Sequence, residues 1–498
     1  MDAATPLTPP PAVVTEQTLS ATALVRRGGV LAGEALADAP QLRPAGRGLL
    51  VAGLPGTLVT LDGVRLTPAA DGQVDLSLLP LGWIDAAHLA AGPAGAAGGA
   101  GALGGLLALD LTPAAAGNRL ALAGGGQAGQ AIGSADLRLG GSGGWLGGGF
   151  TRGGAVPGPA GLAATGQGRW HLGGRIAQDV GQTATLWARG LAAGRSDARW
   201  ADAAAGVAGG TGWRWGLEAA AGGHDDDAIG SSRQTLVRAH LRRETGLILP
   251  GAAEPVVLEG GGEWRRLRLG AQRVTARELY ASAAIPLLQD RPAAEDLQAT
   301  LSLRQSWIAG RAEPLWQAGL RWEVFPGIAL RGQAARSLDD LALRIGSGRS
   351  IGLIATPAFV PGLALTLDWR SQTAGPALVR AADLSLRWRG RIGGDTVLEL
   401  ATQATRTAAA RATLAPVPAF ASLTRVTIER GGWALFAGWR HRSALSPALP
   451  ALDGIDAGVE RQLSARLRLI ASVSNAGDAG RSLGPVGRQA LVQLIAGF

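Results

Sequence analysis

The glycine-rich stretch 90–105 contains Gly99-x-Gly101-x-x-Gly104, which is the spacing of a dinucleotide-binding turn. In that motif a helix follows the glycines, and an acidic residue about 20 positions further on binds the ribose. Here the strand-like sequence LLALDL follows, and no acidic residue lies near position 124. The sequence therefore favours glycines that let backbone pack closely against backbone, and we expect Gly101 and Gly104 to serve that packing.

Two other stretches carry residue types that are used in catalysis or metal binding. Gly140–Gly144 (GGSGG) has the form of a nucleophile elbow, but it lies in a predicted turn between two strands. Asp225, Asp226 and Asp227 follow His224, and carboxylates in a loop are ligands of Ca²⁺. No second acidic loop accompanies them, so we interpret them as a solvated turn. We expect no metal, no cofactor and no enzymatic activity.

The composition excludes several classes of protein. The 498 residues include 77 glycines and 47 basic residues, all of them arginine, and they contain no cysteine. There is therefore no disulfide framework, no thiolate metal site and no P-loop lysine. The net charge of +9 is spread along the chain, so we expect no nucleic-acid partner. The first residues lack the basic and apolar regions of a signal peptide, and no window of about 18 apolar residues predicts a transmembrane helix.

From about residue 114 onward, apolar and polar residues alternate. Leu297–Trp307, Leu363–Trp369 and Leu384–Trp388 are three of these segments. Side chains two positions apart share one face of a strand, so each segment has an apolar and a polar face. We count about 20 to 22 such segments in residues 114–498, separated by short turn clusters and by no linker.

The alternating region is predicted to close into one membrane barrel. Its polar face carries arginine in strand after strand, as a polar lumen would, and most of the 15 tryptophans lie here, often near segment ends, as do Trp307, Trp388 and Trp439. Outer-membrane barrels carry such aromatic girdles. An open sheet edge in lipid would leave unpaired N–H and C=O groups, so the sheet must close. With both chain ends on one side, we predict about 22 antiparallel strands that end at the C-terminal signal Phe498.

Residues 1–113 do not alternate in this way. The Pro-rich segment 1–27 predicts a flexible arm, and residues 28–113 predict a compact α+β domain. Several stretches of this domain resemble the plug domain of TonB-dependent outer-membrane receptors: EALADAPQL (34–42), LLVAGLPGTLVTLDGVRL (49–66) and the run 74–111. The closing ARLRLIASVSNAGDAGR and GRQALVQLIAGF resemble the last hairpin of the family's barrel.

This resemblance implies an all-β protein of the bacterial outer membrane, in which a transmembrane barrel formed by residues 114–498 holds the α+β plug in its lumen. Receptors of the family take up a scarce nutrient, such as an iron chelate or cobalamin. A TonB-type energising complex in the periplasm pulls a short N-terminal segment, the TonB box, which pairs with it as an added strand. The implied partners are outer-membrane lipid, this complex and a small ligand.

The resemblance also assigns roles to single residues. The candidate TonB box is centred on Val13, Val14 and Thr15. The residues expected to pack the plug are Asp62, Gly63, Gly92, Pro93, Gly101 and Gly104. The residues expected to contact a ligand are Arg65, Asp71 and Gln73, which flank the Asp-Gly turn at the plug apex.

Several departures from the family leave an alternative function open. Ala52, His88 and Ala91 stand where many plugs carry charges that lock the plug to the barrel wall, so we expect that lock to be missing. The longest predicted connections are rich in Gly, Ala and Pro and poor in ligand-binding groups: 153–166, 197–211 and 442–455. The alternative is a non-transporting plugged barrel that anchors or assembles with other outer-membrane proteins.

Overall fold

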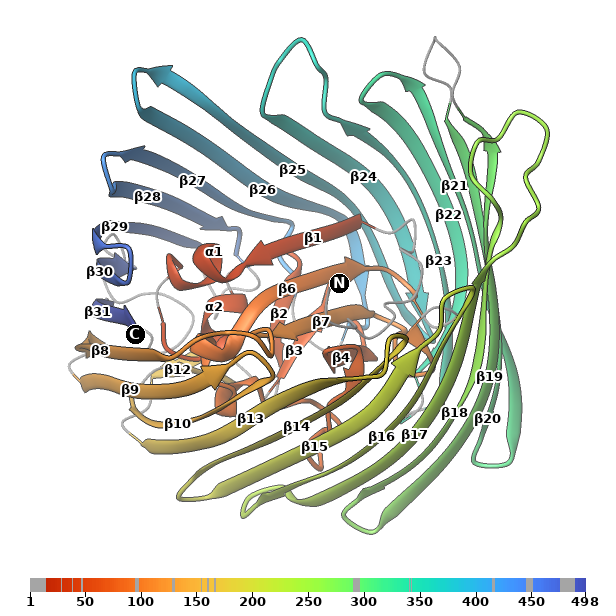
Figure 1. Cartoon of the computed structure of the whole chain (residues 1–498), viewed down its shortest axis with the longest axis horizontal. Helices are drawn as coiled ribbons and strands as arrows, with labels where there is room; N and C mark the ends of the chain where they lie inside the picture. Colours follow the sequence, from red (N-terminus) through yellow and green to blue (C-terminus); the bar gives the residue numbers. More distant parts are fainter. Residues whose placement is uncertain are drawn as a thin grey trace.

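The computed structural model shows a large closed β-barrel with a smaller mixed domain inside it (Figure 1). It describes residues 15–498 except 28, 38, 46–47, 95–97, 128–129, 154, 159–160, 165–166, 290–295, 340, 342, 414–416, 445–450 and 475–488. Within these residues, no helix has the length and apolar character needed to cross a membrane.

The barrel consists of 22 antiparallel strands, which confirms the predicted strand number. Its first half is formed by β8 (Arg119–Gln127), β9 (Gln130–Gly141), β10 (Gly144–Arg152), β13 (Gly168–Val180), β14 (Ala184–Arg195), β15 (Ala198–Gly209), β16 (Trp213–Asp226), β17 (Gly230–Glu244), β18 (Val257–Leu269), β19 (Gln272–Leu288) and β20 (Leu297–Ile308). Its second half is formed by β21 (Arg311–Phe325), β22 (Ile328–Asp339), β23 (Arg344–Ala355), β24 (Leu363–Ala374), β25 (Ala377–Gly393), β26 (Thr396–Arg411), β27 (Phe420–Arg430), β28 (Trp433–Arg442), β29 (Leu452–Ser464), β30 (Leu467–Ser474) and β31 (Gln489–Gly497). A small separate hairpin, β11 (Ala155–Gly158) and β12 (Gly161–Ala164), lies in the connection that follows β10 and precedes β13 in the chain.

Closure is made by the last strand, because β31 pairs with β8 from Gln489–Gln127 to Gly497–Arg119. Burial alternates along the strands, as it does from Ala198 onward in β15. The inward side chains meet the plug, whereas the outward ones include Trp307 and Trp439, both exposed as a membrane girdle requires. All edges of the sheet are thereby paired, which is the condition for a sheet in lipid.

The barrel has two distinct ends. At the terminal end β8 begins and β31 finishes, with the Phe498 N–H donating to the Asn118 carbonyl. At the opposite end, called the far end, hairpins of two or three residues join β14 to β15, β16 to β17 and β18 to β19. The prediction of a long connection at 197–211 was therefore wrong, because β15 fills most of it. The segments 153–166 and 442–455 do contain connections between barrel strands.

The plug is built on a five-stranded sheet in the order β1-β6-β7-β4-β5. Its strands are β1 (Thr15–Ser20), β4 (Thr57–Leu61), β5 (Val64–Arg65), β6 (Ile84–Ala91) and β7 (Gly105–Leu111), and β4 and β7 run parallel. The remaining elements are α1 (Ala21–Val25), α2 (Ala32–Leu36), the hairpin β2 (Leu42–Ala45) with β3 (Gly48–Val51), and the 3₁₀ turns η1 (Leu76–Leu78) and η2 (Leu81–Trp83).

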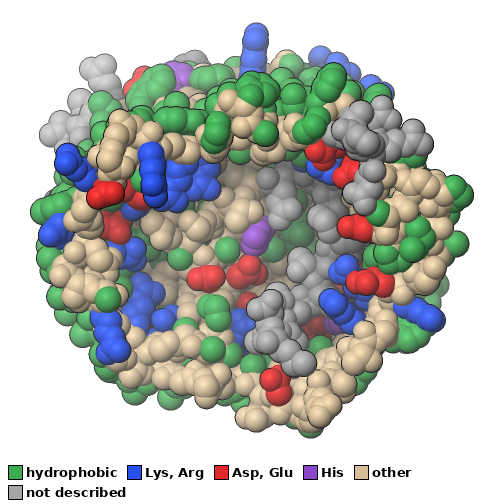
Figure 2. All heavy atoms as spheres, turned by 45° about the horizontal axis from the view of Figure 1, so that its top comes forward, with side chains coloured by type: hydrophobic (Ala, Val, Ile, Leu, Met, Phe, Trp, Pro, Cys, Tyr) green, Lys and Arg blue, Asp and Glu red, His purple; other side chains and the backbone are tan. Residues whose placement is uncertain are grey.

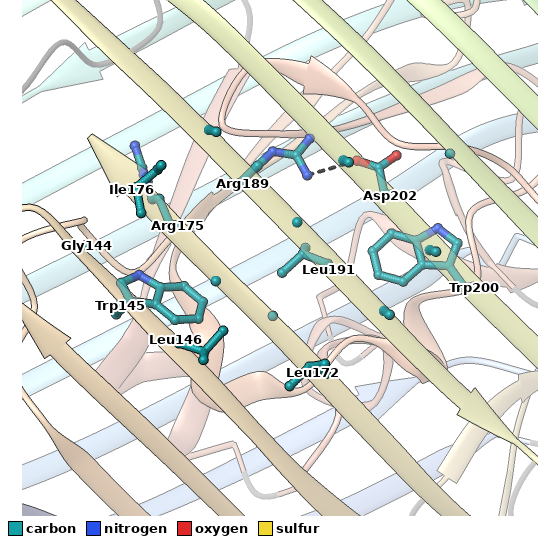
Figure 3. A pocket seen from close by; sticks show the side chains of 18 of the residues that line it. Gly144, Trp145, Leu146, Leu172, Arg175, Ile176, Arg189, Leu191, Trp200 and Asp202 are labelled. Atoms are coloured by element: carbon teal, nitrogen blue, oxygen red, sulfur yellow. Dashed lines mark hydrogen bonds and ion pairs between the residues drawn. The ribbon is translucent and has the colours of Figure 1, made fainter. Parts of the chain in front are cut away.

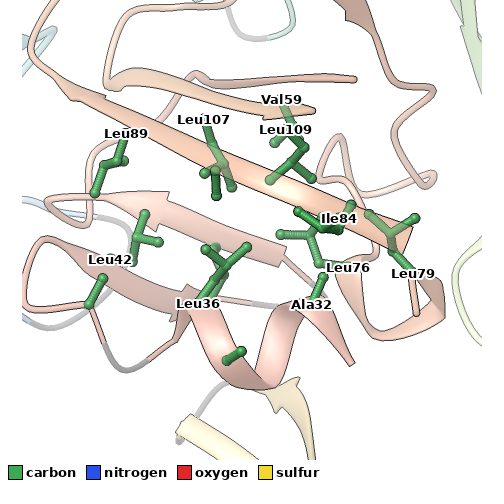
Figure 4. Packing of buried hydrophobic residues seen from close by; sticks show 14 of the residues in the cluster. Ala32, Leu36, Leu42, Val59, Leu76, Leu79, Ile84, Leu89, Leu107 and Leu109 are labelled. Atoms are coloured by element: carbon green, nitrogen blue, oxygen red, sulfur yellow. The ribbon is translucent and has the colours of Figure 1, made fainter. Parts of the chain in front are cut away.

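One face of the plug sheet forms the core of the plug. Leu89, Leu107 and Leu109 point from β6 and β7 toward Leu36 of α2 and Leu42 of β2 (Figure 4). All five are at most 2% exposed. The apolar alternation of β6 and β7 thus supplies the burial that stabilises the plug.

The described part of the N-terminal segment differs from the predicted flexible arm. β1 is an edge strand of the plug sheet, paired with β6 from Thr15–Ala91 to Ser20–Ala86. The Ser20 hydroxyl then caps α1 by accepting from the Ala23 N–H. The sequence hides this strand, because TEQTLS offers only one large apolar side chain, Leu19, to the core.

The turn between β4 and β5 anchors the plug sheet. Asp62 and Gly63 both have positive φ, 49° and 76°, as a tight hairpin turn requires. One oxygen of the Asp62 carboxylate accepts from the Leu111 N–H at 3.0 Å, and the other lies 3.2 Å from Nη1 of Arg175 in β13. Burial raises the pKa of Asp62, and Arg175 opposes that rise.

The glycine-rich crossing between β6 and β7 is packed against other backbone. A Cβ on Gly104 would stand 2.9 Å from the carbonyl oxygen of Pro55, and the Gly104 N–H donates to the Gly56 carbonyl at 2.7 Å. Gly101 has φ 100° and donates to the Leu338 carbonyl of the barrel wall. A strand, β7, follows the glycines, so the dinucleotide-binding alternative lacks its helix.

The plug is fixed to the barrel wall by buried or half-buried ion pairs, so the inferred loss of a lock was wrong. The pairs use residues other than Ala52, His88 and Ala91. They are Arg26 with Glu429 and Glu460, Asp62 with Arg175, Asp75 with Arg195, and Arg65 with Glu263 and Glu278.

Arg65 is one of the most enclosed of these charges. Its side chain is 3% exposed, and Nε lies 3.1 Å from Glu263 while Nη2 lies 3.7 Å from Glu278. The guanidinium also donates to the carbonyls of Gly98 and Ala100. A Cβ on Gly99 would overlap the guanidinium, so the glycine crossing cradles this cation between the plug and β18–β19.

We predict that Gly104→Ala destabilises the plug by about 1–3 kcal/mol, because its methyl group enters the space of the Pro55 carbonyl. Hydrogen exchange of the β7 amides in detergent-solubilised protein measures the loss. Gly117→Ala is the control, since nothing lies within 4 Å of its Cβ position. Equal exchange in both variants would contradict the close packing.

We predict that Arg65→Gln loosens the plug, because it leaves Glu263 and Glu278 buried without this partner. Losing one member of a buried pair costs about 3–5 kcal/mol. Conductance of the barrel in planar bilayers should rise, since a displaced plug opens the lumen. Arg387→Gln removes an exposed pair with Glu399 and should leave conductance unchanged. A closed Arg65→Gln barrel would contradict the role given to this residue.

Candidate ligand-binding site

A cavity of about 230 Å³ lies between the plug and the barrel wall. Its plug side is formed by β4 and the loop that follows β5, and its wall side by β17, β18 and the connection from β22 to β23. The loop belongs to the far end of the barrel, because a Cβ on Gly72 would touch Leu341 in that connection. We call this loop, residues 66–74, the plug apex.

The three residues expected to contact a ligand, Arg65, Asp71 and Gln73, all line this cavity. They differ in access. Asp71 is exposed and accepts from the Gln73 N–H at 3.0 Å, and Gln73 is half-buried with a side-chain oxygen that accepts no hydrogen bond from the described residues. Arg65 is enclosed by its ion pairs, so only the other two present polar groups at the apex.

The barrel wall contributes four polar residues that the sequence analysis did not identify. They are Gln234 of β17, Arg265 of β18, Asp339 at the end of β22 and Arg344 at the start of β23. Gln234 donates to the Arg65 carbonyl at 3.2 Å, which ties the wall to the plug. In the sequence these residues are distinguished only by lying at inward-facing positions of alternating strands. Every barrel strand has such positions, so the pattern does not single these residues out.

Arg344 is the exposed cation of the cavity, whereas Arg265 and Asp339 are buried. The guanidinium of Arg344 can therefore bind an anionic ligand group, and the carboxylate of Asp71 can bind an ammonium-like group. The amide of Gln73 can form hydrogen bonds with either. Leu49, Leu58, Leu66 and Leu267 supply the apolar part of its lining. Most small-molecule sites combine a few convergent polar groups with such a lining.

Of the other predicted site residues, Gly101 also lines this cavity, and the rest lie outside it. Val13 and Val14 are outside the described residues, and Thr15 begins β1. Gly92 has φ 124° and follows β6, and Pro93 stands close to Gly348 of β23. Phe498 closes the chain beside Asn118.

The acidic run 225–227 lies at the far end of β16. Asp225 forms a bidentate pair with Arg233 at 2.8 and 2.9 Å, while Asp226 lies 3.4 Å from Arg195 and accepts from the Ala228 N–H. The Asp227 N–H donates to the Asp197 carbonyl. Within the described residues no group of three or more His, Cys, Asp or Glu side chains could hold a metal ion.

The other face of the plug sheet is polar and open to solvent. His88 of β6 lies 2.9 Å from Asp110 of β7 and 3.1 Å from the Thr18 hydroxyl of β1, which links three neighbouring strands. Figure 2 shows the barrel hollowed at one end, with basic and acidic side chains round the rim and further acidic side chains deeper inside. The lumen is therefore polar, as the alternation predicted.

Comparisons with known proteins agree with this architecture. Residues 11–106 match the family described as the TonB-dependent receptor plug domain. The fold is similar to that of the ferric enterobactin receptor of Pseudomonas aeruginosa, with a TM-score of 0.77, 13% identity, and 97% of this chain and 98% of that chain covered. The siderophore receptor PirA of Acinetobacter baumannii gives 0.77, 11%, 97% and 98%, and a ferric citrate transporter gives 0.74, 11%, 98% and 97%.

No curated protein matches the chain. The plug match and the closed barrel are nevertheless independent of each other, because the first rests on residues 11–106 and the second on strands from Arg119 to Gly497. The chain thus carries a TonB-dependent receptor plug domain inside a 22-stranded barrel, which is the fold of TonB-dependent receptors of the bacterial outer membrane.

Proposed function

We propose that this chain is an active receptor and transporter that takes up a small anionic iron chelate. The observation that carries the proposal is the cavity at the plug apex, which is bounded by the plug on one side and by the barrel wall on the other. A ligand bound there contacts both parts at once, so its binding free energy can depend on how the plug sits.

The proposed orientation follows from the lengths of the connections between barrel strands. Outer-membrane barrels have short periplasmic turns and longer extracellular loops. The two longest connections of this barrel, from β10 to β13 and from β30 to β31, join strands at the far end, so the terminal end faces the periplasm. The far end, with the plug apex and its cavity, then faces the outside. This places the cavity where a nutrient would arrive.

The chemistry of the cavity supports a small anionic ligand. Arg344 is exposed at the cavity, and the arginine fork suits carboxylate groups. A volume of about 230 Å³ lies below the roughly 300–1,000 Å³ of most ligand pockets, so it fits a compact chelate better than a bulky one. Among the solved structures of this fold are receptors and transporters named for ferric enterobactin and ferric citrate.

The alternative role, a non-transporting anchor, is not favoured. It was motivated by a missing plug lock, yet the plug is held by ion pairs through Arg26, Asp62, Arg65 and Asp75. The other argument for it was that the connections between barrel strands are short. That is true of the far-end hairpins, but a ligand can bind between the plug and the barrel wall without long loops.

We predict that Arg344→Gln weakens binding of ferric citrate to the purified protein roughly ten-fold, because one charge-assisted contact is lost. Titration calorimetry measures the affinity. Arg349→Gln is the matched control, since Arg349 lies on the same strand, is exposed and does not line the cavity. Equal affinities for the two variants, or no binding by the native protein, would count against this ligand class.

We predict that Val14→Pro abolishes uptake of radioactive ferric citrate by cells while binding to the purified protein is kept. Proline removes an N–H that strand pairing with the energising complex requires. Ala4→Pro, outside the candidate box, should transport normally. Transport that survives Val14→Pro would show that the box lies elsewhere or that uptake is not energised.

A further inference from the structure

Three arginines occupy directly opposite positions on three adjacent strands of the outer wall. Arg233 of β17 faces Arg268 of β18, and Arg268 faces Arg273 of β19. All three are exposed, while their chain neighbours Gln234 and Leu267 are buried against the interior. We call Arg233, Arg268 and Arg273 the arginine ladder, and it stands at the far end of the barrel.

The ladder collects positive charge with little compensation. Like charges that are directly opposite on neighbouring strands destabilise a sheet. Arg199, Arg266 and Arg277 add further exposed cations on the same face. Asp225 stands opposite Arg199 and forms an ion pair with Arg233. Within the described part of the chain, Arg268 and Arg273 form no ion pair, and Arg268 donates only to the Gly270 carbonyl. Such a surface favours an anion with more than one negative group.

A large apolar hollow begins beside these charges. It measures about 1610 Å³ and runs over the outer wall from Arg199, Asp225 and Arg233 to Leu139 and Gly140 near the terminal end. Small outward residues form its floor: Gly174, Gly190, Ala192, Ala201, Ala203 and Ala221. Figure 3 shows Leu146, Leu172 and Ile176 along one side of it.

The hollow is shallow, open and apolar, so hydrocarbon chains can lie along it. Leu146, Leu172 and Ile176 are 62%, 54% and 60% exposed, so their apolar surface faces the lipid. The hollow crosses most of the wall, from the charged end to the other rim. It therefore joins a cationic end at the far side of the membrane to an apolar path through its hydrocarbon region, which a soluble anion would not need.

We propose that this surface binds a phosphorylated glycolipid of the outer leaflet, with its phosphates on the arginine ladder and an acyl chain in the hollow. Arginine forks hold phosphate oxygens in pairs, and acyl chains gain contact in a groove that flat barrel walls lack. The site rests on the orientation given under the proposed function, and it is separate from the ligand cavity and from transport.

The test uses the full chain purified in detergent and diphosphorylated lipid A as the probe. Native mass spectrometry measures the bound fraction as lipid A is titrated. Arg268→Gln/Arg273→Gln should weaken binding roughly ten-fold, because two charge-assisted contacts are lost. Arg430→Gln/Arg461→Gln, which removes two cations near the terminal ends of β27 and β29, should bind as the native chain does.

Two further arms separate the parts of the proposal. Ala221→Leu fills the hollow and should weaken lipid A, whereas Ala239→Leu, on β17 outside the hollow, should not. Lipid A without phosphates should bind as weakly to the native chain as intact lipid A binds to the ladder variant. Full displacement of lipid A by millimolar inorganic phosphate would overturn the lipid site and indicate a free-anion site instead.

The outcomes are independent of uptake. Val14→Pro should retain lipid A, so a failure of transport does not touch this site. Equal lipid A binding by the ladder variant and its control would overturn the site, and it would leave the uptake proposal standing. If native mass spectrometry instead showed a soluble acidic protein bound to the chain and no lipid A, that result would also overturn the lipid site.

Discussion

The structure depends on how a single cation is held between its two parts. Arg65 leaves the plug sheet at the end of β5, and its guanidinium is shared by the carbonyls of Gly98 and Ala100 and by two carboxylates of the wall, Glu263 and Glu278. A buried charge is tolerated only when it is paired and hydrogen-bonded. The glycine crossing therefore has to wrap closely, and the plug has to sit in one place. The position of the plug in turn sets the geometry of the apex cavity.

The glycines have the spacing of a phosphate-binding turn, yet here they surround a cation with carbonyl oxygens. Positive φ at Gly99 and Gly101 turns the backbone round the guanidinium, and Gly104 admits the Pro55 carbonyl. The same residue type serves both functions, because what it supplies is close approach of backbone. The element that follows decides between them, and here it is β7.

The barrel could be predicted from the sequence because lipid imposes a rule on every strand: one face is apolar, and no edge stays open. The plug contacts could not. Arg65 and Glu278 are distant in sequence, and no spacing joins them, so the sequence gives no sign of the ion pairs of Arg65. β15 was read as part of a connection, because its outward positions hold alanines instead of large apolar residues. Asp71 and Gln73 were placed at the apex through the Asp-Gly turn, a local signal.

The small residues of β14 to β16 show how one wall serves two surroundings. Their inward positions hold large or charged side chains that contact the plug: Trp200 packs in the plug core cluster, Asp202 accepts a hydrogen bond from Thr67, and Arg195 forms an ion pair with Asp75. Several of their outward positions, such as Gly190, Ala201 and Ala221, hold alanine or glycine, which leaves this part of the wall thin toward the lipid. A strand in a bilayer normally gains its apolar contact outward. Here part of that contact is left for a lipid chain to supply, and the cations at the far end fix which end of the lipid lies there.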